Sequence, residues 1–522
     1  MSFSRLSPDP VLNLFRENPF AVVAAAAGVL FMIRFVALAL LRVGYPYQLE
    51  WIEGMVLIQV QRVLNGEPMF VEPSIRYIPC LYTPLYFYVS AAAAWVMGLG
   101  FLPLRLVSFI STLVTFAIIF DFVRRETGRA WPGLIAAGLL AAAFDKTGLW
   151  MDIARVDSLF LCLTFAFVYV LHFYGARHWG WAVAAGVLGG MAFLTKQTAA
   201  PILALMTVYE LAFRPRRIWP APAVAAIVVA AALGWFQWRS GGWFGYYAFE
   251  MMSGHGILRE YLVAFWTVDL KSLFPIGLLI AAGAPPLLWL QRGWKSALFH
   301  ALLAVSLIIT AWTSRMHIGG WTNVLIPAVA ALSILTGIAA GLAATQPRLN
   351  RKIAWLLCLA IGFQFWALHM PEADAVPTAE DRKAGEKFEK LMAELPGDVF
   401  APGQGYIAAR VGKTPFVHTA TSIDVLRGPD CPARRKYNEE VATAIRTKRF
   451  GAIVSDTYPR FFGFEDEIAA NYKMGQSIYP TSDAFFPVTG VPMRPEVILT
   501  RRPTSPTAAS HPPAPLVKSI FE

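Results

Sequence analysis

The residues best suited to chemistry in this chain are acidic, and the first of them lie in one polar stretch at residues 45–86. Glu50 and Glu53, in this stretch, are three residues apart, which places them on one face of a helix. A carboxylate held beside apolar sequence is costly to desolvate and therefore needs a reason. Either the stretch is a solvated loop, or one of the two glutamates is a catalytic base or a metal ligand.

A second group of polar residues flanks or interrupts later apolar sequence. Asp152, Arg155 and Asp157 precede one apolar segment, Lys196 interrupts another, and His255 lies in the longest polar connection. Taken singly, each of them fits a charge at a helix end whose stem lies in apolar surroundings. Taken together, they suit a site where a carboxylate activates an acceptor and cations hold a phosphate leaving group.

The elements that must position these residues are membrane helices. The 522 residues are 56% hydrophobic and only 15% charged, with a mean hydropathy of +0.50. This is too apolar for an ordinary soluble protein, and several segments are long enough to cross a bilayer. The apolar segments are 20–42, 83–101, 104–122, 131–149, 156–174, 179–195, 198–213, 219–238, 272–290, 297–313, 321–345 and 353–369.

The positive charges predict the orientation. The net charge of +11 does not require nucleic acid, because basic residues favour the cytoplasmic loops of membrane proteins. The connections dense in Arg and Lys are 124–129, 214–217, 292–295 and 348–352. If these connections and the N-terminal residues 1–19 are cytoplasmic, the loops 43–82 and 239–271 lie on the outer side.

This orientation allows only one net crossing between residues 83 and 122. We therefore expect 83–101 to be re-entrant or interfacial and 104–122 to be the true span, since a non-crossing segment must be buried in protein or line a cavity. The region 20–370 then makes eleven crossings and ends on the outer side.

The composition changes after residue 370. A charged amphipathic helix is expected at 378–394 and another helix at 436–448, with short strands at 398–401, 452–455 and 496–500. This alternation predicts a small α/β domain at 371–502 on the outer side. The remaining residues 503–522 are rich in Pro, Ser and Ala and are expected to be a disordered tail.

The order of several short motifs resembles one known family. After the acidic pair come Leu64-Asn65-Gly66-Glu67-Pro68, Tyr82-Thr83-Pro84-Leu85-Tyr86, Ala154-Arg155-Val156-Asp157 and Phe193-Leu194-Thr195-Lys196. Over roughly residues 20–240 this order resembles the polyprenyl-phosphate-dependent glycosyltransferases of the GT-C fold, in the protein O-mannosyltransferase and aminoarabinose transferase (family 39-like) group. That family usually has Asp-Glu in the first loop, whereas this chain has Glu50-Trp-Ile-Glu53, so either glutamate remains a candidate for the base.

The resemblance implies an α-helical polytopic protein of a bacterial inner (plasma) membrane, with a GT-C-like domain and a small C-terminal α/β domain. It implies transfer of a sugar, with inversion, from a polyprenyl-phosphate donor to a lipid, glycan or protein acceptor on the outer face. Its site residues carry over as a base (Glu50 or Glu53), an acceptor- or cation-orienting carboxylate (Asp157), phosphate ligands (Lys196, Arg155 and His255) and acceptor or sugar contacts (Tyr82 and Asp152). The resemblance implies no definite cofactor. A divalent metal is an open alternative but is not demanded, because Arg and Lys can neutralise a monophosphate.

Two other classes of protein remain as alternatives. A transporter or lipid flippase would explain the many spans and Arg34 inside the first one, but it predicts paired repeats with broken helices, and no repeat is visible. A structural membrane subunit would leave the polar residues of the outer loops without a purpose.

Overall fold

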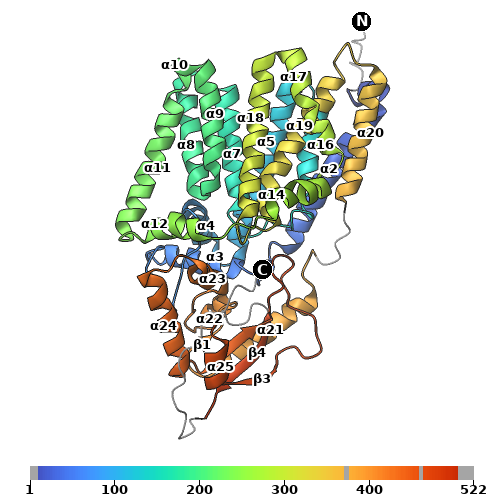
Figure 1. The fold of residues 1–522 in the computed structure, drawn as a ribbon. Helices are drawn as coiled ribbons and strands as arrows, with labels where there is room; N and C mark the ends of the chain where they lie inside the picture. The colour runs from blue at the N-terminus through green and yellow to red at the C-terminus, as the bar shows by residue number, and fades with distance from the viewer. Residues whose placement is uncertain (1–9, 370–374, 458–462, 504–522) are drawn as a thin grey trace.

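The computed structural model describes residues 10–369, 375–457 and 463–503 (Figure 1). A bundle of apolar helices stands on a smaller domain that contains the only sheet among these residues. Most of the expected tail at 503–522 and half of the N-terminal segment 1–19 lie outside the described residues.

Six helical segments in the described residues are long and apolar enough to cross a membrane, and the bent pair 261–273 and 277–292 makes a seventh. The long helices are α2 (Pro19–Arg42), α5 (Phe101–Thr127), α11 (Pro220–Arg239), α18 (Trp294–Met316), α19 (Ile326–Ala343) and α20 (Arg351–Leu368). Four shorter apolar helices complete the bundle: α6 (Ala130–Ala142), α7 (Asp157–Phe173), α8 (Trp179–Thr195) and α9 (Ala200–Phe213). The protein is therefore a multi-pass membrane protein, as the hydropathy predicts.

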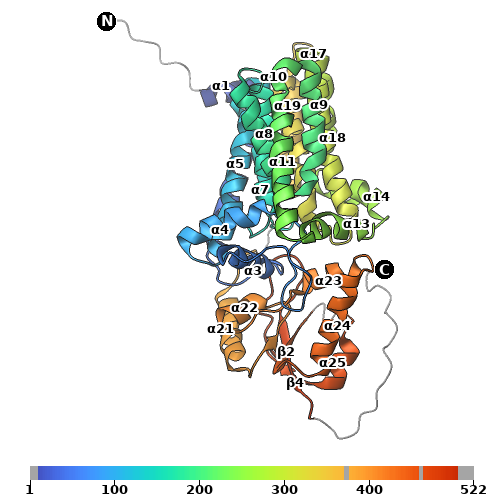
Figure 2. The same ribbon diagram turned by 90° about the vertical axis from the view of Figure 1, so that its left-hand side faces the viewer.

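Helix α4 (Leu85–Met97) does not belong to this set. It packs against α3 (Glu53–Leu64) at the end of the bundle nearest the smaller domain, and α5 begins only four residues after it (Figure 2). This is the interfacial placement that the charge pattern requires of residues 83–101.

The basic connections gather at the opposite end of the bundle. Helix α10 (Pro215–Ile218), with Arg216 and Arg217, and the C-terminal end of α17 (Ala284–Arg292) lie there, far from the smaller domain (Figure 1). The 239–271 connection lies at the other end, where it forms short helices from α12 (Trp243–Gly245) to α15 (Lys271–Leu273), with π-helical turns at 246–250 and 265–270.

Helix α19 is the centre of the bundle. Every one of its residues is buried, and it packs against α5, α6, α16 (Gly277–Ala282), α17, α18 and α20. A helix that is apolar all round is stable only when other helices surround it. Small residues bring other helices close as well: Gly28 of α2 faces Gly138 of α6 with no room for a Cβ atom between them.

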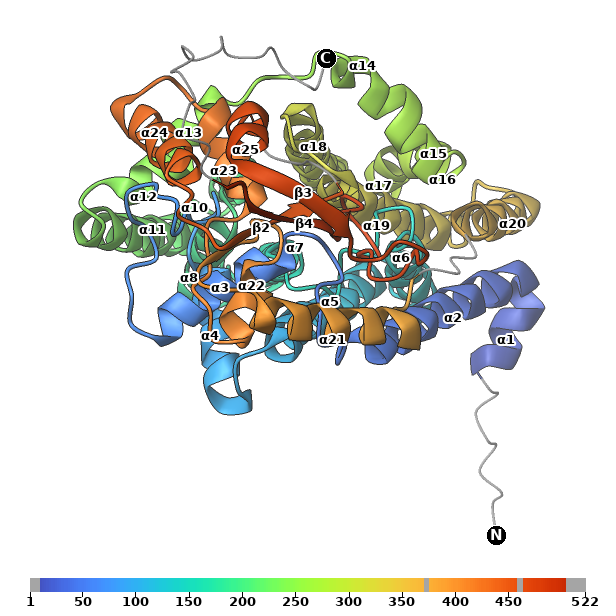
Figure 3. The same cartoon turned by 90° about the horizontal axis from the view of Figure 1, so that it is seen from below.

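The smaller domain holds a four-stranded sheet in the order β1-β2-β4-β3, with helices on both of its faces (Figure 3). Strands β1 (Val399–Phe400) and β2 (Ala452–Asp456) are parallel, whereas β4 (Pro495–Arg501) is antiparallel to both β2 and β3 (Tyr472–Ser477). The helices are α21 (Ala379–Glu394), α22 (Gly405–Arg410), α23 (Thr419–Arg427), α24 (Pro432–Arg446) and α25 (Glu465–Asn471). The fold class expected from the sequence is thus confirmed.

Strand β3 was not expected. It lies at the edge of the sheet, and four of its six residues are exposed, so its sequence lacks the apolar alternation that marks a half-buried strand.

Candidate active site

Glu50 and Glu53 lie where the chain passes from α2 into α3, at the end of the bundle that faces the smaller domain. Both side chains have no exposed surface, so this part of the polar stretch is not a solvated loop. The two carboxylates nevertheless have very different partners.

Glu53 is fully hydrogen-bonded. The Nε and Nη2 atoms of Arg105 donate to its two carboxylate oxygens at 3.0 and 2.7 Å, and the backbone N–H groups of Leu49 and Ala154 each donate to one oxygen at 2.6 Å. Burial alone would raise the pKa of Glu53, but Arg105 and these donors hold it below its ordinary value. Glu53 is therefore a fixed carboxylate that ties the start of α3 to α5 and to the 143–156 loop.

Glu50 is only half satisfied. Its Oε2 atom accepts hydrogen bonds from the Ile52 N–H at 3.1 Å and from Arg155 Nη1 at 3.2 Å, whereas its Oε1 atom has no hydrogen-bond partner among the described residues. Burial raises the pKa of Glu50 to about 7, with Arg155 opposing the shift. A carboxylate with one free oxygen and a pKa near 7 is well suited to accept a proton.

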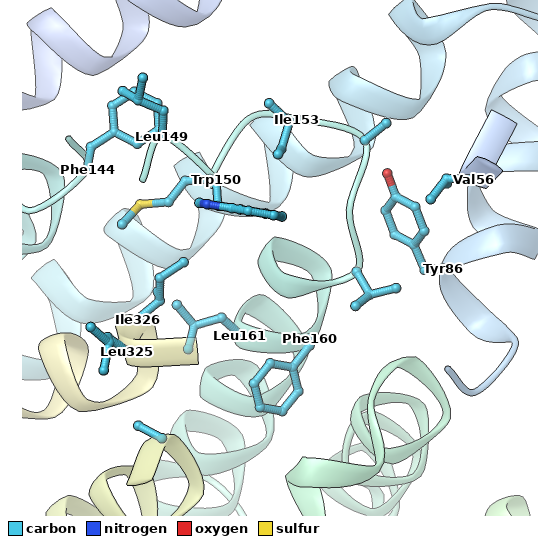
Figure 4. Close-up of a cluster of buried hydrophobic side chains, with 14 of the residues drawn as sticks. Val56, Tyr86, Phe144, Leu149, Trp150, Ile153, Phe160, Leu161, Leu325 and Ile326 are labelled. Carbon is cyan, nitrogen blue, oxygen red and sulfur yellow. The ribbon is translucent and has the colours of Figure 1, made fainter. Parts of the chain in front are cut away.

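Arg155 connects Glu50 to Tyr82. Its Nη2 atom donates to the Tyr82 hydroxyl at 3.2 Å, and its guanidinium group lies 4.9 Å from the ring centroid of Trp150. The sequence separates these residues widely, and the structure joins them because the 143–156 loop folds back into the bundle. Its apolar side chains, including Trp150 and Ile153, pack there beside α7 (Figure 4).

Asp157 and Lys196 form a second buried pair, at the start of α7 and the end of α8. Lys196 Nζ lies 2.7 Å from Asp157 Oδ1, and the side-chain amide of Asn323 donates to the same oxygen at 3.2 Å. The Oδ2 atom of Asp157 has no partner in the described part of the chain. The Lys196 ammonium group also lies 5.9 Å from the Tyr82 ring centroid, so Tyr82 contacts both cations.

A recess opens beside this second pair. Asp157, Lys196 and Asn323 line it together with the apolar side chains of Phe160, Leu161 and Ile326, and it has room for about one water molecule.

Two of the predicted site residues lie elsewhere. Asp152 forms a buried, bidentate ion pair with Arg42 that uses both of its oxygens, and its contact with the acceptor or sugar stays a prediction. His255 approaches Asp424 of α23, with Nε2 and Oδ1 3.8 Å apart, and the contacts among described residues do not include one to Arg155 or Lys196. The structure therefore does not group His255 with the other phosphate ligands.

Two residues of the site were missed from the sequence. Arg105 lies within an apolar segment, where a charge needs a buried partner, and that signal could have identified it. The sequence gives a weaker signal for Asn323, because a single side-chain amide before an apolar segment is common at helix starts.

No group of three or more His, Cys, Asp or Glu side chains within the described residues is arranged to hold a metal ion. Glu50 and Asp157 each already face a cationic side chain. These donors do not fit a divalent cation, and no step below depends on one.

Comparisons with known proteins agree with this geometry. Residues 81–238 match the model of the dolichyl-phosphate-mannose-protein mannosyltransferase family. The structure is similar to ArnT from Cupriavidus metallidurans bound to undecaprenyl phosphate, with a TM-score of 0.54, 15% identity and coverage of 90% of this chain and 97% of that one. The chain has the GT-C fold.

Other comparisons show how widely this glycosyltransferase fold is shared. ArnT in the apo state has a TM-score of 0.55 at 14% identity, with the same coverage of both chains. The oligosaccharyltransferase of Archaeoglobus fulgidus, in complex with Zn and sulfate, has a TM-score of 0.50 at 13% identity, covering 84% of this chain and 68% of that one. A search of curated proteins found no match. The resemblance inferred from the motifs is confirmed, and the transporter alternative is not favoured.

The family match covers the cations of the glycosyltransferase site but not its glutamates. Tyr82, Arg155, Asp157 and Lys196 lie within the matched residues, whereas Glu50 and Glu53 precede them. The role of the glutamates therefore rests on the geometry described above.

Proposed function

We propose that the protein transfers a sugar, with inversion, from a polyprenyl-phosphate donor to an acceptor hydroxyl at the end of the bundle that faces the smaller domain. The observation that carries this proposal is the pair of half-satisfied ion pairs, Glu50–Arg155 and Asp157–Lys196, on either side of Tyr82. Each pair offers a cation for a phosphate and a carboxylate oxygen that is still free.

Glu50 acts as the general base. The acceptor oxygen attacks the anomeric carbon of the donor, its proton passes to Glu50 Oε1, and the bond from that carbon to the phosphate oxygen breaks with its electron pair on the phosphate. Attack from the side opposite the phosphate inverts the anomeric carbon. Proton transfer to a positioned carboxylate contributes roughly 10²–10⁴-fold to such a step.

Arg155 and Lys196 stabilise the departing phosphate. A guanidinium group presents five N–H donors in a fork, so Arg155 can bind Glu50 and Tyr82 and still donate to a phosphate oxygen. Lys196 lies at the wall of the recess, where its ammonium group is held by Asp157. Asp157 orients Lys196, and its free oxygen is available to a sugar hydroxyl.

The orientation follows from the charges. We place the basic connections and residues 1–19 in the cytoplasm, the bundle 20–370 in the inner membrane, and the domain 371–502 on the outer side. Reporter fusions after residue 370 test this topology, and activity of a cytoplasmic reporter alone would overturn it.

A transfer assay tests the reaction. Purified protein in lipid nanodiscs is incubated with a panel of undecaprenyl-phosphate sugars carrying labelled sugar, and both the transferred and the hydrolysed label are measured. We expect one donor to be consumed by the native protein and not by the Glu50→Gln variant. Consumption of every donor at the background rate, with no binding of undecaprenyl phosphate, would refute the proposal.

A further inference from the structure

An exposed apolar patch lies at the far end of α4 and at the start of α5. We call it the α4 tip, and it consists of five exposed side chains: Trp95, Val96, Met97, Leu99 and Leu102. Trp95 and Val96 are 81% and 75% exposed, and the sequence has no charged residue between Arg76 and Arg105. A contiguous apolar surface of this kind is unusual in water and marks a place where something covers it.

The α4 tip points away from the rest of the protein. Helix α4 leaves the bundle sideways, at the end that faces the smaller domain (Figures 2 and 3). It packs against α3 and α5 and buries Tyr86, Ser90 and Ala94 there, whereas the residues of the α4 tip remain outside these contacts. Whatever covers the α4 tip is therefore not among the described residues.

Exposed tryptophans mark the two boundaries of the bilayer on this bundle. Trp179 and Trp219 are exposed at the end with the basic connections, and Trp238 is exposed at the opposite end of α11. Trp238 lies 19 residues after Trp219, which is about 29 Å along a helix, and the hydrocarbon core of a bilayer is about 30 Å thick. Tryptophan is enriched at both membrane–water interfaces, so these side chains give the two levels.

The α4 tip lies at the boundary nearer the smaller domain. Leu102 precedes Arg124, at the basic end of α5, by 22 residues, or about 33 Å of helix. Leu102, Ile110 and Val114 are all exposed and follow one another at multiples of four residues along α5. The apolar surface of the α4 tip thus continues into the lipid-facing side of a membrane span, which identifies lipid as its occupant.

Hydrogen bonds join α4 to the candidate site at the same level. Thr83, beside Tyr82 and two residues before α4, donates through Oγ1 to the Phe193 carbonyl oxygen at 3.0 Å. Lys196 follows α8 directly and lies 17 residues after Trp179, about 26 Å along the helix. The α4 tip and Lys196 therefore lie within a few ångströms of the same bilayer boundary.

We propose that the α4 tip inserts into the outer leaflet and fixes the height at which Tyr82 and Lys196 meet the phosphate of a lipid donor. The insertion stands on the geometry alone, whereas the role toward the donor rests on the proposed function. The phosphate of a membrane lipid lies just outside the hydrocarbon boundary, which is the level that Lys196 and the α4 tip share. A donor then reaches both cations by lateral diffusion, without leaving the bilayer.

A nitroxide attached to Val96→Cys, in the full-length protein in lipid nanodiscs, measures the insertion. Oxygen, which dissolves in the bilayer, should relax this label strongly, and a water-soluble nickel chelate should not. Asp430→Cys replaces an exposed carboxylate of the smaller domain and should show the reverse, and labelled native protein supplies the background of its own cysteines. Strong relaxation by nickel would place the α4 tip in water, and exclusion of both reagents would place a second copy or another protein on it; either result would overturn the insertion.

The double variant Trp95→Asp/Val96→Asp measures the effect on the donor. Its KM for an undecaprenyl-phosphate sugar in nanodiscs should rise at least about tenfold, because charged side chains resist transfer into an apolar phase. Its KM for the same sugar on a water-soluble, short-chain prenyl phosphate should not change, which also shows that the variant is folded. Trp238→Asp is the matched control: it charges an exposed tryptophan of the same boundary, away from α4, and should keep the native KM for both donors.

The outcomes separate this inference from the proposed function. If the native protein consumes no donor while the label at residue 96 lies in lipid, the reaction is refuted and the insertion stands. If the double variant keeps the native KM for the undecaprenyl donor, the α4 tip does not set the height of the site, and the reaction stands. An equal rise in KM for both donors would indicate a distorted site and would likewise overturn the role toward the donor.

Discussion

Two sets of buried ion pairs lie close together at one end of this bundle, and they differ in how many of their hydrogen-bonding positions are filled. In Glu53–Arg105 and Asp152–Arg42, both oxygens of each carboxylate are bound. In Glu50–Arg155 and Asp157–Lys196, one oxygen of each carboxylate has no partner among the described residues. The first set fixes the loops in place, and the second set retains the capacity to bind and react.

The difference does not come from residue type or burial, because all four carboxylates are almost fully buried beside a cation. It comes from how the cation binds. Arg105 and Arg42 each donate to both oxygens of their carboxylate, whereas Arg155 and Lys196 each donate to one oxygen only. A carboxylate whose two oxygens both accept hydrogen bonds indicates a structural ion pair, whereas the presence of an ion pair alone does not.

Removing the base should give the largest effect. Glu50→Gln keeps the shape of the side chain but not its ability to accept a proton, so kcat should fall roughly 10²–10⁴-fold while donor binding remains. Transfer kinetics and undecaprenyl phosphate binding, measured on the same preparation, check this. Activity close to that of the native protein would remove Glu50 from the mechanism.

Glu53→Gln should instead affect folding. It leaves Arg105 buried without its counter-charge, and breaking a buried pair in this way typically costs about 3–5 kcal/mol of stability. Thermal unfolding in detergent should show a large loss for Glu53→Gln and recovery of part of it in Glu53→Gln/Arg105→Met. A stable but inactive Glu53→Gln variant would exchange the roles assigned to the two glutamates.

The pH profile should follow Glu50. Its pKa of about 7 means that the carboxyl is protonated, and unable to act as a base, below that value. We expect kcat/KM to rise about tenfold per pH unit up to near pH 7 and then to level off. A profile that is flat between pH 5 and 8 would contradict the assignment.

Lys196→Met should raise the donor KM by roughly 10–100-fold, because a charge-assisted hydrogen bond to phosphate is worth about 1.5–3 kcal/mol. The change also leaves Asp157 without its cation, so the control is Asp157→Asn/Lys196→Met, which removes both charges. If both variants kept the donor KM of the native protein, Lys196 would only be a buried partner of Asp157.

The smallest effect should appear in Asp456→Asn. Burial raises the pKa of Asp456 to about 7, with partial opposition from Gln404 and the Gly403 N–H. In the folded protein Asp456 keeps its proton up to about pH 7, whereas in the unfolded chain it releases that proton at lower pH. The free energy of unfolding therefore falls as the pH rises toward 7. The variant removes this loss and should be more stable than the native protein by roughly 1–3 kcal/mol at pH 8, and by less at pH 5. Equal stability of the two proteins at pH 8 would show that burial does not raise the pKa of Asp456.

The sequence predicts the parts of this molecule that depend on local pattern. Hydropathy and charge identify the bundle and the place of α4 at its end, and Asp157 meets Lys196 because α7 and α8 are neighbours joined by a short connection. Contacts between residues that are far apart in the sequence cannot be predicted from local pattern. Arg42 lies 110 residues from Asp152, and no pattern near Asp152 indicates that it is already bound.

His255 shows a second limit. The 239–271 connection folds into short helices with π-helical turns, whose spacing follows neither a helical nor a strand period. The sequence shows that the histidine lies in an outer loop, but not that it meets Asp424 instead of the phosphate ligands.

The position of α19 has a consequence for biosynthesis. This wholly buried helix is the penultimate span to leave the ribosome, so the helices made before it must wait in the bilayer without the surface on which they finally pack. Asn323, just ahead of α19, reaches Asp157 only after that insertion. The candidate site is therefore completed late in translation, and nascent chains that stop before residue 326 should be open to membrane proteases.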